Sequence, residues 1–312
     1  MITIGNDQVA DALAYDRLIE ALRDMFCSTY TMPVRHHHFY KTVESVENTV
    51  ILMPVWNDRY LGIKQVVVAP ANGEKGLPAI HAHYMLMDAV TGQPLAQLNA
   101  AQLTARRTAC TSALAASFLA PKDAESLLIV GGGKVAQHLV QAHTVMRSYR
   151  RISIWTRHAA NSQDFAAHLA TLGHRVEIER DLEKAARDAD VIACATLSPS
   201  PLIRGEWLKP GTHLDLIGSH TPNTREVDDE AIRRSTIFVD SREGALHETG
   251  ELAIPIAQGV LDPAEVQADI AELVKGVHPG RTDPGEITLF KSAGLAVEDL
   301  AAALLVYESV RG

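Results

Sequence analysis

The chain has 312 residues, of which 46% are hydrophobic, and this is enough for two domains with separate cores. Its 29 basic and 38 acidic residues give a formal net charge of −9, which argues against a nucleic acid or a membrane surface as partner but allows a local basic pocket for a small anion. The three cysteines form no C-x-x-C pair, and no signal peptide or membrane-length apolar run is present. We therefore expect a cytoplasmic protein.

The first part of the chain predicts an α+β domain over residues 1–121. Apolar residues at helical spacing predict one amphipathic helix over residues 8–30. Strand-like runs at 49–55, 60–69 and 80–88 are separated by turn signals such as Asn72-Gly73. A long alanine-rich helix over 100–119 then ends before Pro121.

From Ser126 onward, short apolar runs alternate with helical patterns. This alternation predicts an α/β domain of Rossmann type over residues 122–291, with a doubly wound parallel sheet. The predicted strands are 127–130, 152–155, 175–178, 191–195, 213–217 and 236–240, with helices over 159–172 and 182–188 among the connections. A C-terminal helix, expected over 292–310, packs back on the first domain.

A glycine-rich turn follows the first strand of this second domain. Gly131, Gly133 and Ala136 fit the G-x-G-x-x-G/A spacing of a dinucleotide-binding turn, in which a helix N-terminus receives the pyrophosphate. A P-loop is excluded, because Leu128 and Val135 stand where its first Gly and its Ser/Thr belong. The alternative is a glycine-rich turn that binds nothing.

The end of the next strand indicates which dinucleotide would bind. An NAD site usually has Asp or Glu there, about 20 residues beyond the glycines, to hold the ribose 2′-hydroxyl. Here the sequence is Thr156-Arg157-His158, without a carboxylate. Arg157 could hold a 2′-phosphate, with Thr156 as a further donor, so the pattern favours NADP(H) over NAD(H). The alternative for Arg157 is an ordinary arginine of a surface loop.

Two cations of the first domain stand out by position. Lys64 lies inside the apolar run GIKQVVVA, so it is either paired or functional, or it faces solvent as the alternation of its neighbours allows. Arg107 follows Arg106 in a helix of small residues, a pattern more typical of a solvated helix face than of a carboxylate clamp. The consecutive His36–His38 cannot all face one metal, and we expect no metal site. Serine or cysteine hydrolysis has no supporting motif.

Several motifs run through the chain in an order typical of one family. They are GIK at 62–64, GLP at 76–78, TGQPLA at 91–96, LTARRTA at 103–109, GGGKVA at 131–136, RGEWLKPGTH at 204–213, GSHTPNTREVD at 218–228, VDSREGAL at 239–246 and LFKSAGLAVEDL at 289–300. With these motifs the chain resembles the ornithine cyclodeaminase/mu-crystallin family over nearly its whole length. The resemblance implies a homodimer whose first domain, completed by a C-terminal helix over 292–312, binds the substrate and forms the dimer.

The resemblance also implies roles for individual residues. Lys64 and Arg107 line the substrate pocket, with Arg35 as a further candidate, and the substrates are small α-amino or α-imino acids whose carboxylate a guanidinium can orient. The resemblance implies a set of cofactor contacts, to which the glycine turn adds Ala136. They are Gly131, Gly133, Lys134, Val135, Thr156, Arg157, His158, Ala195, Thr196, Leu197 and, near the nicotinamide, Ser292.

The chain departs from the family pattern at two positions. Val135 stands where the family commonly has Gln. Ornithine cyclodeaminases carry an Asp two residues after the glycine that matches Gly218, and this chain has His220 there. The change removes the obvious partner for a substrate ammonium group.

We therefore expect an NAD(P)H-dependent reductase of small cyclic imino acids or α-keto/imino acids, of the ketimine reductase, pyrroline-2-carboxylate reductase or alanine dehydrogenase type. Arg107 would anchor the carboxylate, and Lys64 or His220 would handle the proton. The alternatives are an ornithine cyclodeaminase, a lyase that forms proline and ammonia with bound NAD, and a non-catalytic, mu-crystallin-like binder that depends on NADPH.

Overall fold

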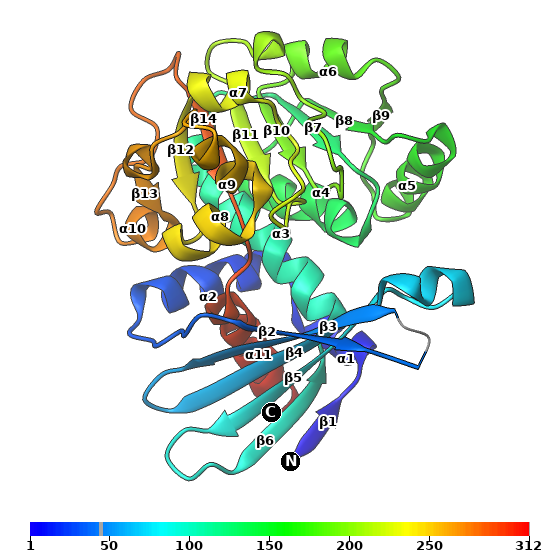
Figure 1. Ribbon diagram of the computed structural model, residues 1–312, viewed down its shortest axis with the longest axis vertical. Coiled ribbons are helices and arrows are strands. Elements are labelled where there is room, and N and C mark those ends of the chain that lie inside the picture. The colour runs from blue at the N-terminus through cyan, green and yellow to red at the C-terminus, as the bar shows by residue number, and fades with distance from the viewer. Residues whose placement is uncertain (44–45, 312) are drawn as a thin grey trace. The chain divides into compact units, whose positions relative to one another are not determined.

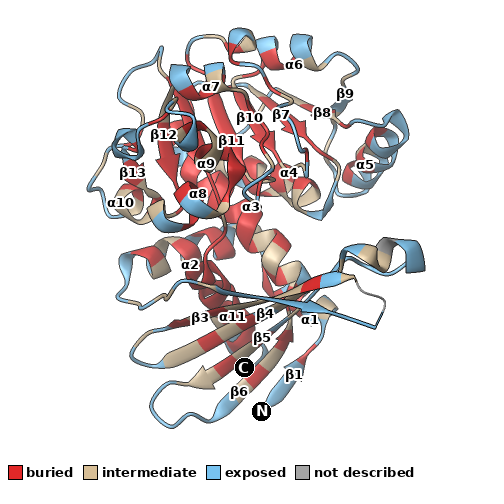
Figure 2. Cartoon of the chain, in the orientation of Figure 1, coloured by how far each residue is buried: buried red, intermediate tan, exposed pale blue. Residues whose placement is uncertain are grey.

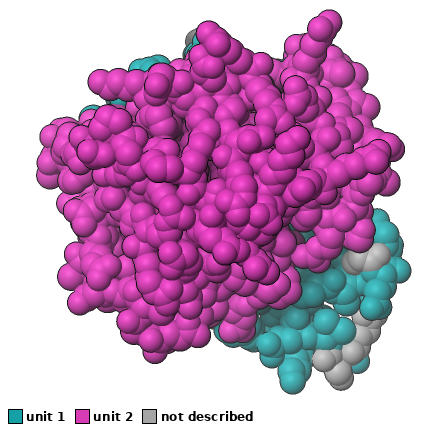
Figure 3. Space-filling model, turned by 90° about the horizontal axis from the view of Figure 1, so that it is seen from above, with its two compact units in different colours: residues 1–107, 295–312 teal, residues 108–294 magenta. Residues whose placement is uncertain are grey.

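The computed structural model describes residues 1–43 and 46–311 and contains two compact units (Figure 1). Unit 1 comprises Met1–Arg107 and Leu295–Gly312, and unit 2 comprises Thr108–Gly294; Figure 3 shows them in separate colours. From the sequence alone the divisions are expected after residues 121 and 291. In the structure the first boundary between the units falls after Arg107, inside helix α3 (Ala100–Leu119). The predicted end of the C-terminal helix at Gly312 lies outside the described residues.

Unit 1 is built on a six-stranded sheet in the order β1-β6-β5-β4-β3-β2. Neighbouring strands are antiparallel from β6 through β2, and β1 pairs parallel with β6. Strands β3, β4 and β5 confirm the three predicted strands, whereas β1, β2 and β6 add to them. All six residues of β2 are exposed, so no buried apolar face marks it in the sequence. The strands are β1 (Ile2–Ile4), β2 (His36–Lys41), β3 (Glu47–Trp56), β4 (Tyr60–Val68), β5 (Ile80–Asp88) and β6 (Pro94–Asn99).

The helices of unit 1 differ from the prediction at their ends. The expected helix over residues 8–30 is wrong as one element, because it divides into α1 (Asn6–Ala12) and α2 (Tyr15–Cys27). The buried Leu13 leaves helical geometry between them, and its carbonyl accepts from Arg106 at 2.7 Å. Helix α11 begins at Ala296 rather than 292 and runs to Arg311, packing on α2, β3 and β4. A 3-10 turn, η1, covers Pro70–Lys75.

Unit 2 contains an eight-stranded sheet in the order β13-β12-β14-β11-β10-β7-β8-β9, in which every pairing is parallel. This confirms the predicted Rossmann-type sheet. The strands are β7 (Ser126–Val130), β8 (Arg151–Trp155), β9 (Glu177–Ile178), β10 (Val191–Cys194), β11 (His213–Leu216), β12 (Ser235–Val239), β13 (Ala268–Asp269) and β14 (Ile287–Lys291). The chain passes from β7 to β8 on one side and returns to β10 on the other, so the winding reverses at β7.

Strand β14 is an unpredicted part of this sheet and lies between β11 and β12. All five of its residues are buried, although Thr288 and Lys291 are polar. Their partners, the carbonyls of Leu119 and Leu216, are distant in sequence. The run ITLFK therefore lacks the continuous apolar character expected of a central parallel strand.

Helices cover the sheet of unit 2, and Figure 2 shows its central strands as buried (Figure 2). They are α4 (Lys134–Met146), α5 (Ala159–Thr171), α6 (Leu182–Asp188), α7 (Asp229–Arg234), α8 (Arg242–Glu248), α9 (Gly250–Ala257) and α10 (Ile270–Val274), with short 3-10 turns at Gly205–Trp207 and Pro263–Glu265. In the part of the chain that the structure describes, no helix combines the length and the apolar character needed to cross a membrane.

Gly62 on β4 generates a prediction about stability. A Cβ at this position would overlap the hydroxyl group of Tyr84, which is fully buried on the neighbouring strand β5. Gly62→Ala should therefore lower the free energy of unfolding by roughly 1–3 kcal/mol in a urea titration, as overpacked core variants do. In a Tyr84→Ala background the same change should cost less than about 1 kcal/mol. Equal costs in the two backgrounds would contradict this account.

Candidate functional site

The glycine turn follows β7 at the point where the sheet reverses its winding. Gly131 has φ +122°, and a Cβ there would lie 2.5 Å from the carbonyl oxygen of Ala195. Its N–H donates to the carbonyl of Trp155 at 2.9 Å. The turn therefore fits between the ends of β8 and β10 only because the residue lacks a side chain.

The start of α4 has the features that a pyrophosphate needs. Gly133 is its N-cap and forms no side-chain cap, and a Cβ there would meet no atom within 4 Å. The first N–H groups of α4 and the positive end of its dipole thus lie beside an open backbone. Lys134 is exposed at this end, Val135 is half-buried, and the buried Ala136 keeps the helix close to the sheet. These residues fit a dinucleotide pyrophosphate.

The segment after β8 gives Thr156 and Arg157 different roles. The hydroxyl group of Thr156 donates to the carbonyl of His158 at 2.7 Å and lies 2.7 Å from the hydroxyl of Ser162. It therefore stabilises its own turn, and a contact between Thr156 and a dinucleotide stays a prediction. The exposed Arg157 reaches the hydroxyl of Ser198 at 3.3 Å, and His158 is exposed beside it.

The remaining predicted cofactor residues follow the carboxyl ends of β10 and β14, at the same edge of the sheet. Ala195 and Thr196 are half-buried, and Leu197 is 73% exposed. After β14, the buried Ser292 donates to Asp240 at 3.1 Å, and the same carboxylate oxygen accepts the N–H groups of Ala293 and Gly294 at 2.6 Å. These bonds hold the segment as a loop, which is why α11 does not begin at 292.

His220 lies in the loop after β11, between Gly218 and the segment that returns to β12. Its ring is exposed, and Nδ1 lies 3.1 Å from the carbonyl oxygen of Gly218. The ring is therefore open to solvent in unit 2, and a role in proton transfer stays a prediction.

Unit 1 buries the two cations that the sequence left in doubt. Lys64 is 2% exposed and Arg107 is 4% exposed, so neither lies on a solvated face. Asp299 of α11 binds both, with its Oδ2 2.6 Å from Nζ of Lys64 and its Oδ1 accepting from Nε of Arg107 at 3.0 Å. Arg107 also forms an ion pair with Glu298. The interpretation of Arg107 as a solvated residue is wrong.

The charges around Lys64 affect its titration. Burial, together with the positive charges of Arg107 and of the half-buried Arg35, lowers the pKa of Lys64 to about 8, against the opposing effect of Asp299. Lys64, Arg107 and the two carboxylates of α11 therefore form one buried cluster of interacting charges.

Sequence reasoning missed Glu298 and Asp299, although the motif that contains them was recognised. Both side chains are fully buried in a helix that is otherwise apolar over its first two turns. Two adjacent acids within such a run are the signal that could have revealed them, because a buried carboxylate needs a cation.

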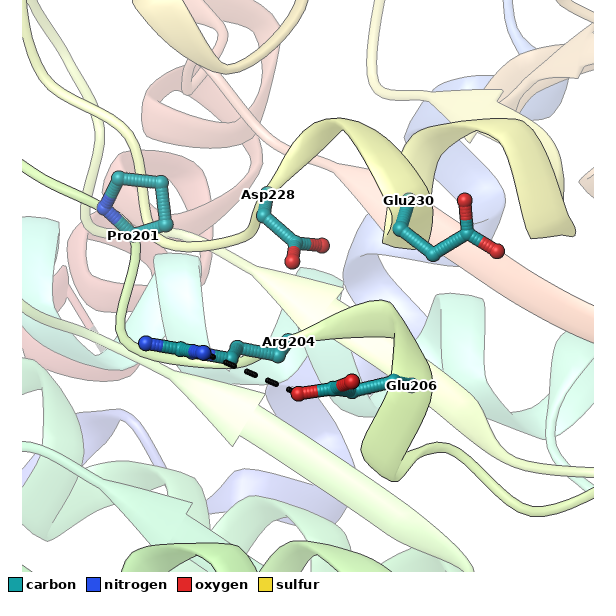
Figure 4. Close-up of a pocket in the computed structure, with 5 residues that line it drawn as sticks. All are labelled: Pro201, Arg204, Glu206, Asp228 and Glu230. Atoms are coloured by element: carbon teal, nitrogen blue, oxygen red, sulfur yellow. Dashed lines mark ion pairs between the residues drawn. The ribbon is translucent and has the colours of Figure 1, made fainter.

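A separate pocket lies in unit 2 and is lined by Pro201, Arg204, Glu206, Asp228 and Glu230 (Figure 4). Arg204 pairs with Glu206 at 3.8 Å, and Asp228 accepts the N–H groups of Gly205 and Ala231. Its charged groups thus have structural partners, and none of the predicted site residues lines it. Within residues 1–43 and 46–311, no group of three or more His, Cys, Asp or Glu side chains is placed to hold a metal ion.

The model of the ornithine cyclodeaminase/mu-crystallin family matches residues 2–312. The chain belongs to this family. A Delta(1)-pyrroline-2-carboxylate reductase of Colwellia psychrerythraea is 34% identical over 314 residues, covering 99% of this chain and 99% of that protein. Among solved structures, Thermococcus litoralis Delta(1)-pyrroline-2-carboxylate reductase in complex with NADH and L-proline aligns with a TM-score of 0.93 and 31% identity, covering 100% and 98% of the two chains. An archaeal alanine dehydrogenase dimer with bound NAD aligns with a TM-score of 0.92 and 28% identity, covering 100% and 96%.

Lys64 gives this family member a pH-dependent stability. The pKa of its ammonium group is about 8 in the folded protein, against 10.5 ordinarily. Because the unfolded chain binds this proton more strongly, the stability that Lys64 contributes is present in full above pH 10.5 and is lost as the pH falls through 8. In urea titrations over this window, the free energy of unfolding of the wild type minus that of Lys64→Met should rise with pH, by at most about 1.4 kcal/mol per unit.

The matched control is Lys64→Arg, whose guanidinium keeps its charge throughout the window. Its free energy of unfolding relative to Lys64→Met should show no such rise. A wild-type difference that stays flat would contradict the lowered pKa.

Proposed function

We propose that this protein is an NAD(P)H-dependent reductase of small cyclic imino acids, and that the buried cations of unit 1 bind the substrate carboxylate. The observation that carries the proposal is the burial of Lys64 and Arg107, two cations that the carboxylates of Glu298 and Asp299 hold in fixed orientation. The similar proteins named as pyrroline-2-carboxylate reductases support the substrate class, and the alanine dehydrogenase supports the wider class of α-keto and imino acids.

The reaction adds a hydride to the imine carbon, while the electron pair of the C=N bond passes to nitrogen, which takes up a proton. A bound nicotinamide supplies the hydride. Arg107 orients the substrate carboxylate with its planar guanidinium, which Asp299 and Glu298 hold in place. Lys64, with a pKa of about 8, can donate a proton near neutral pH, and Asp299 accepts a hydrogen bond from it.

Unit 2 would hold the dinucleotide at the carboxyl edge of its sheet. The residues proposed to contact it are Gly131, Gly133, Lys134, Val135, Ala136, Thr156, Arg157, His158, Ala195, Thr196, Leu197 and Ser292. We further propose that NADP(H) is preferred, that unit 1 forms the dimer contacts of a cytoplasmic homodimer, and that Arg35 assists in binding the substrate. The dimeric form of the similar alanine dehydrogenase supports the homodimer.

The assay that tests the reductase uses purified protein, NADPH or NADH, and the cyclic imines pyrroline-2-carboxylate and piperideine-2-carboxylate. We expect loss of the near-ultraviolet absorbance of the reduced nicotinamide and formation of the cyclic amino acid. Proline and ammonia from ornithine without net use of cofactor would instead identify a cyclodeaminase. Tight binding of a carboxylate with no turnover of any imine would identify a binder, and either result overturns the proposal.

Two adjacent arginines provide a matched pair of variants for the same assay. Arg107→Lys removes the planar fork and should lower kcat/KM about 10- to 100-fold, as loss of a bidentate charged contact does. Arg106, which binds the carbonyl of Leu13 and lies over the ring of Tyr15, is the control, and Arg106→Lys should change kcat/KM less than about 3-fold. Similar effects of the two variants would argue against the clamp.

The proposed NADP(H) preference leads to a separate prediction at Arg157. Arg157→Ala should raise KM for NADPH about 10- to 100-fold and KM for NADH less than about 3-fold, because only NADPH carries the 2′-phosphate. The control is Arg175→Ala, which changes another exposed arginine of the same unit. Equal KM changes for the two dinucleotides would exclude Arg157 as the 2′-phosphate clamp.

A further inference from the structure

A fully buried carboxylate joins the loops that follow β10 and β11. Oε1 of Glu226 accepts the N–H of Thr196 at 2.7 Å and its hydroxyl at 2.8 Å. Oε2 of the same side chain accepts the N–H of Gly218 at 2.7 Å. Glu226 has no exposed surface, so these donors replace the water molecules that would otherwise solvate its carboxylate. One side chain therefore satisfies the first polar groups of two loops.

The loops are in direct contact where Glu226 binds them. A Cβ on Gly218 would overlap the backbone of Thr196 and lie 2.5 Å from Oε1 of Glu226. On its other side, the same segment contacts the glycine turn, because Gly131 leaves no room for a Cβ beside Ala195. The position of the glycine turn thus depends on the loop after β10. Glu226 holds that loop through its bonds to Thr196.

Two further buried charged groups act on Glu226. Glu251 of α9 accepts the N–H groups of Glu226 and Val227 at 2.7 and 3.0 Å. Lys291 of β14 donates to the carbonyl of Leu216 at 3.0 Å, and its positive charge opposes the burial that raises the pKa values of both glutamates. Glu251 therefore fixes the backbone of Glu226, and the charge of Lys291 favours the ionised form of its carboxylate.

We propose that Glu226 is a positioning residue for the dinucleotide, fixing residues 195–197 and Gly218 so that the glycine turn keeps the geometry that binds the pyrophosphate. This inference rests on the proposed function, which makes these loops cofactor contacts. A glutamine cannot replace Glu226. The donors are divided between both carboxylate oxygens, and the amide NH₂ of glutamine would face an N–H on one side.

The test measures steady-state kinetics and dinucleotide binding for Glu226→Gln in the full-length protein. KM for NADPH should rise about 10- to 100-fold, as expected for lost hydrogen bonds to a charged group, while kcat at saturating NADPH stays within about 3-fold. Binding of NADPH, followed by its fluorescence, should weaken by the same factor.

The control is Thr288→Val, near the N-terminal end of β14 and away from the proposed cofactor loops. It removes buried hydrogen bonds, among them the one that the hydroxyl of Thr288 donates to the carbonyl of Leu119. It should change KM for NADPH less than about 2-fold while lowering the unfolding temperature. If Glu226→Gln raises KM no more than this control does, the inference is overturned. If instead the wild type binds no dinucleotide, the proposed function itself fails.

Should Glu226→Gln not fold, Glu226→Asp decides, since it keeps the charge but its shorter side chain cannot reach the donors of both loops. It should raise KM for NADPH about 3- to 10-fold with kcat unchanged. An unchanged KM would overturn the inference.

Discussion

The ion pairs between α11 and the two buried cations are the constraint on which unit 1 depends. Lys64 and Arg107 come from β4 and α3, and their carboxylate partners come from the end of the chain. Removing one partner of a buried pair typically costs about 3–5 kcal/mol, because the other charge is left without compensation. The strand and the two helices must therefore be assembled together, and the cations acquire fixed orientations as a result. Fixed orientation is what a carboxylate-binding group requires.

Unit 2 uses buried carboxylates for a related purpose. Asp240 accepts the N–H groups of the loop after β14, and Glu226 accepts those of the loops after β10 and β11. A carboxylate that accepts backbone N–H groups forms strong, directional bonds and limits the conformations of a loop. The edge of the sheet can thus present ordered backbone to a ligand although its connections are irregular. Polar side chains buried in the core provide this order.

The sequence predicts the parts of this fold that depend on local patterns. Strand–helix alternation and the glycine turn indicate the parallel sheet of unit 2, and three apolar runs indicate β3, β4 and β5. Strand β14 is not predicted, since Thr288 and Lys291 are buried by partners far along the chain. The break at Leu13 is likewise invisible, because the apolar spacing continues through it.

The candidate site shows the same limit. The motifs single out Lys64 and Arg107, but the burial of Arg107 depends on Glu298, which lies 191 residues away in the sequence. Without that partner, an arginine in a helix of small residues is correctly expected to be solvated. The resemblance to the family predicts roles for these residues that periodicity and spacing do not.

The division of unit 1 between the two ends of the chain affects the order of synthesis. Unit 2 is continuous in sequence, whereas the sheet of unit 1 is synthesised first and lacks α11 until the residues after unit 2 have been added. During this interval Lys64 and Arg107 lack their partners Asp299 and Glu298, and the face that α11 covers is open. Nascent chains of this protein therefore carry an incomplete N-terminal sheet while the central unit emerges, and exposed apolar surface of this kind favours aggregation.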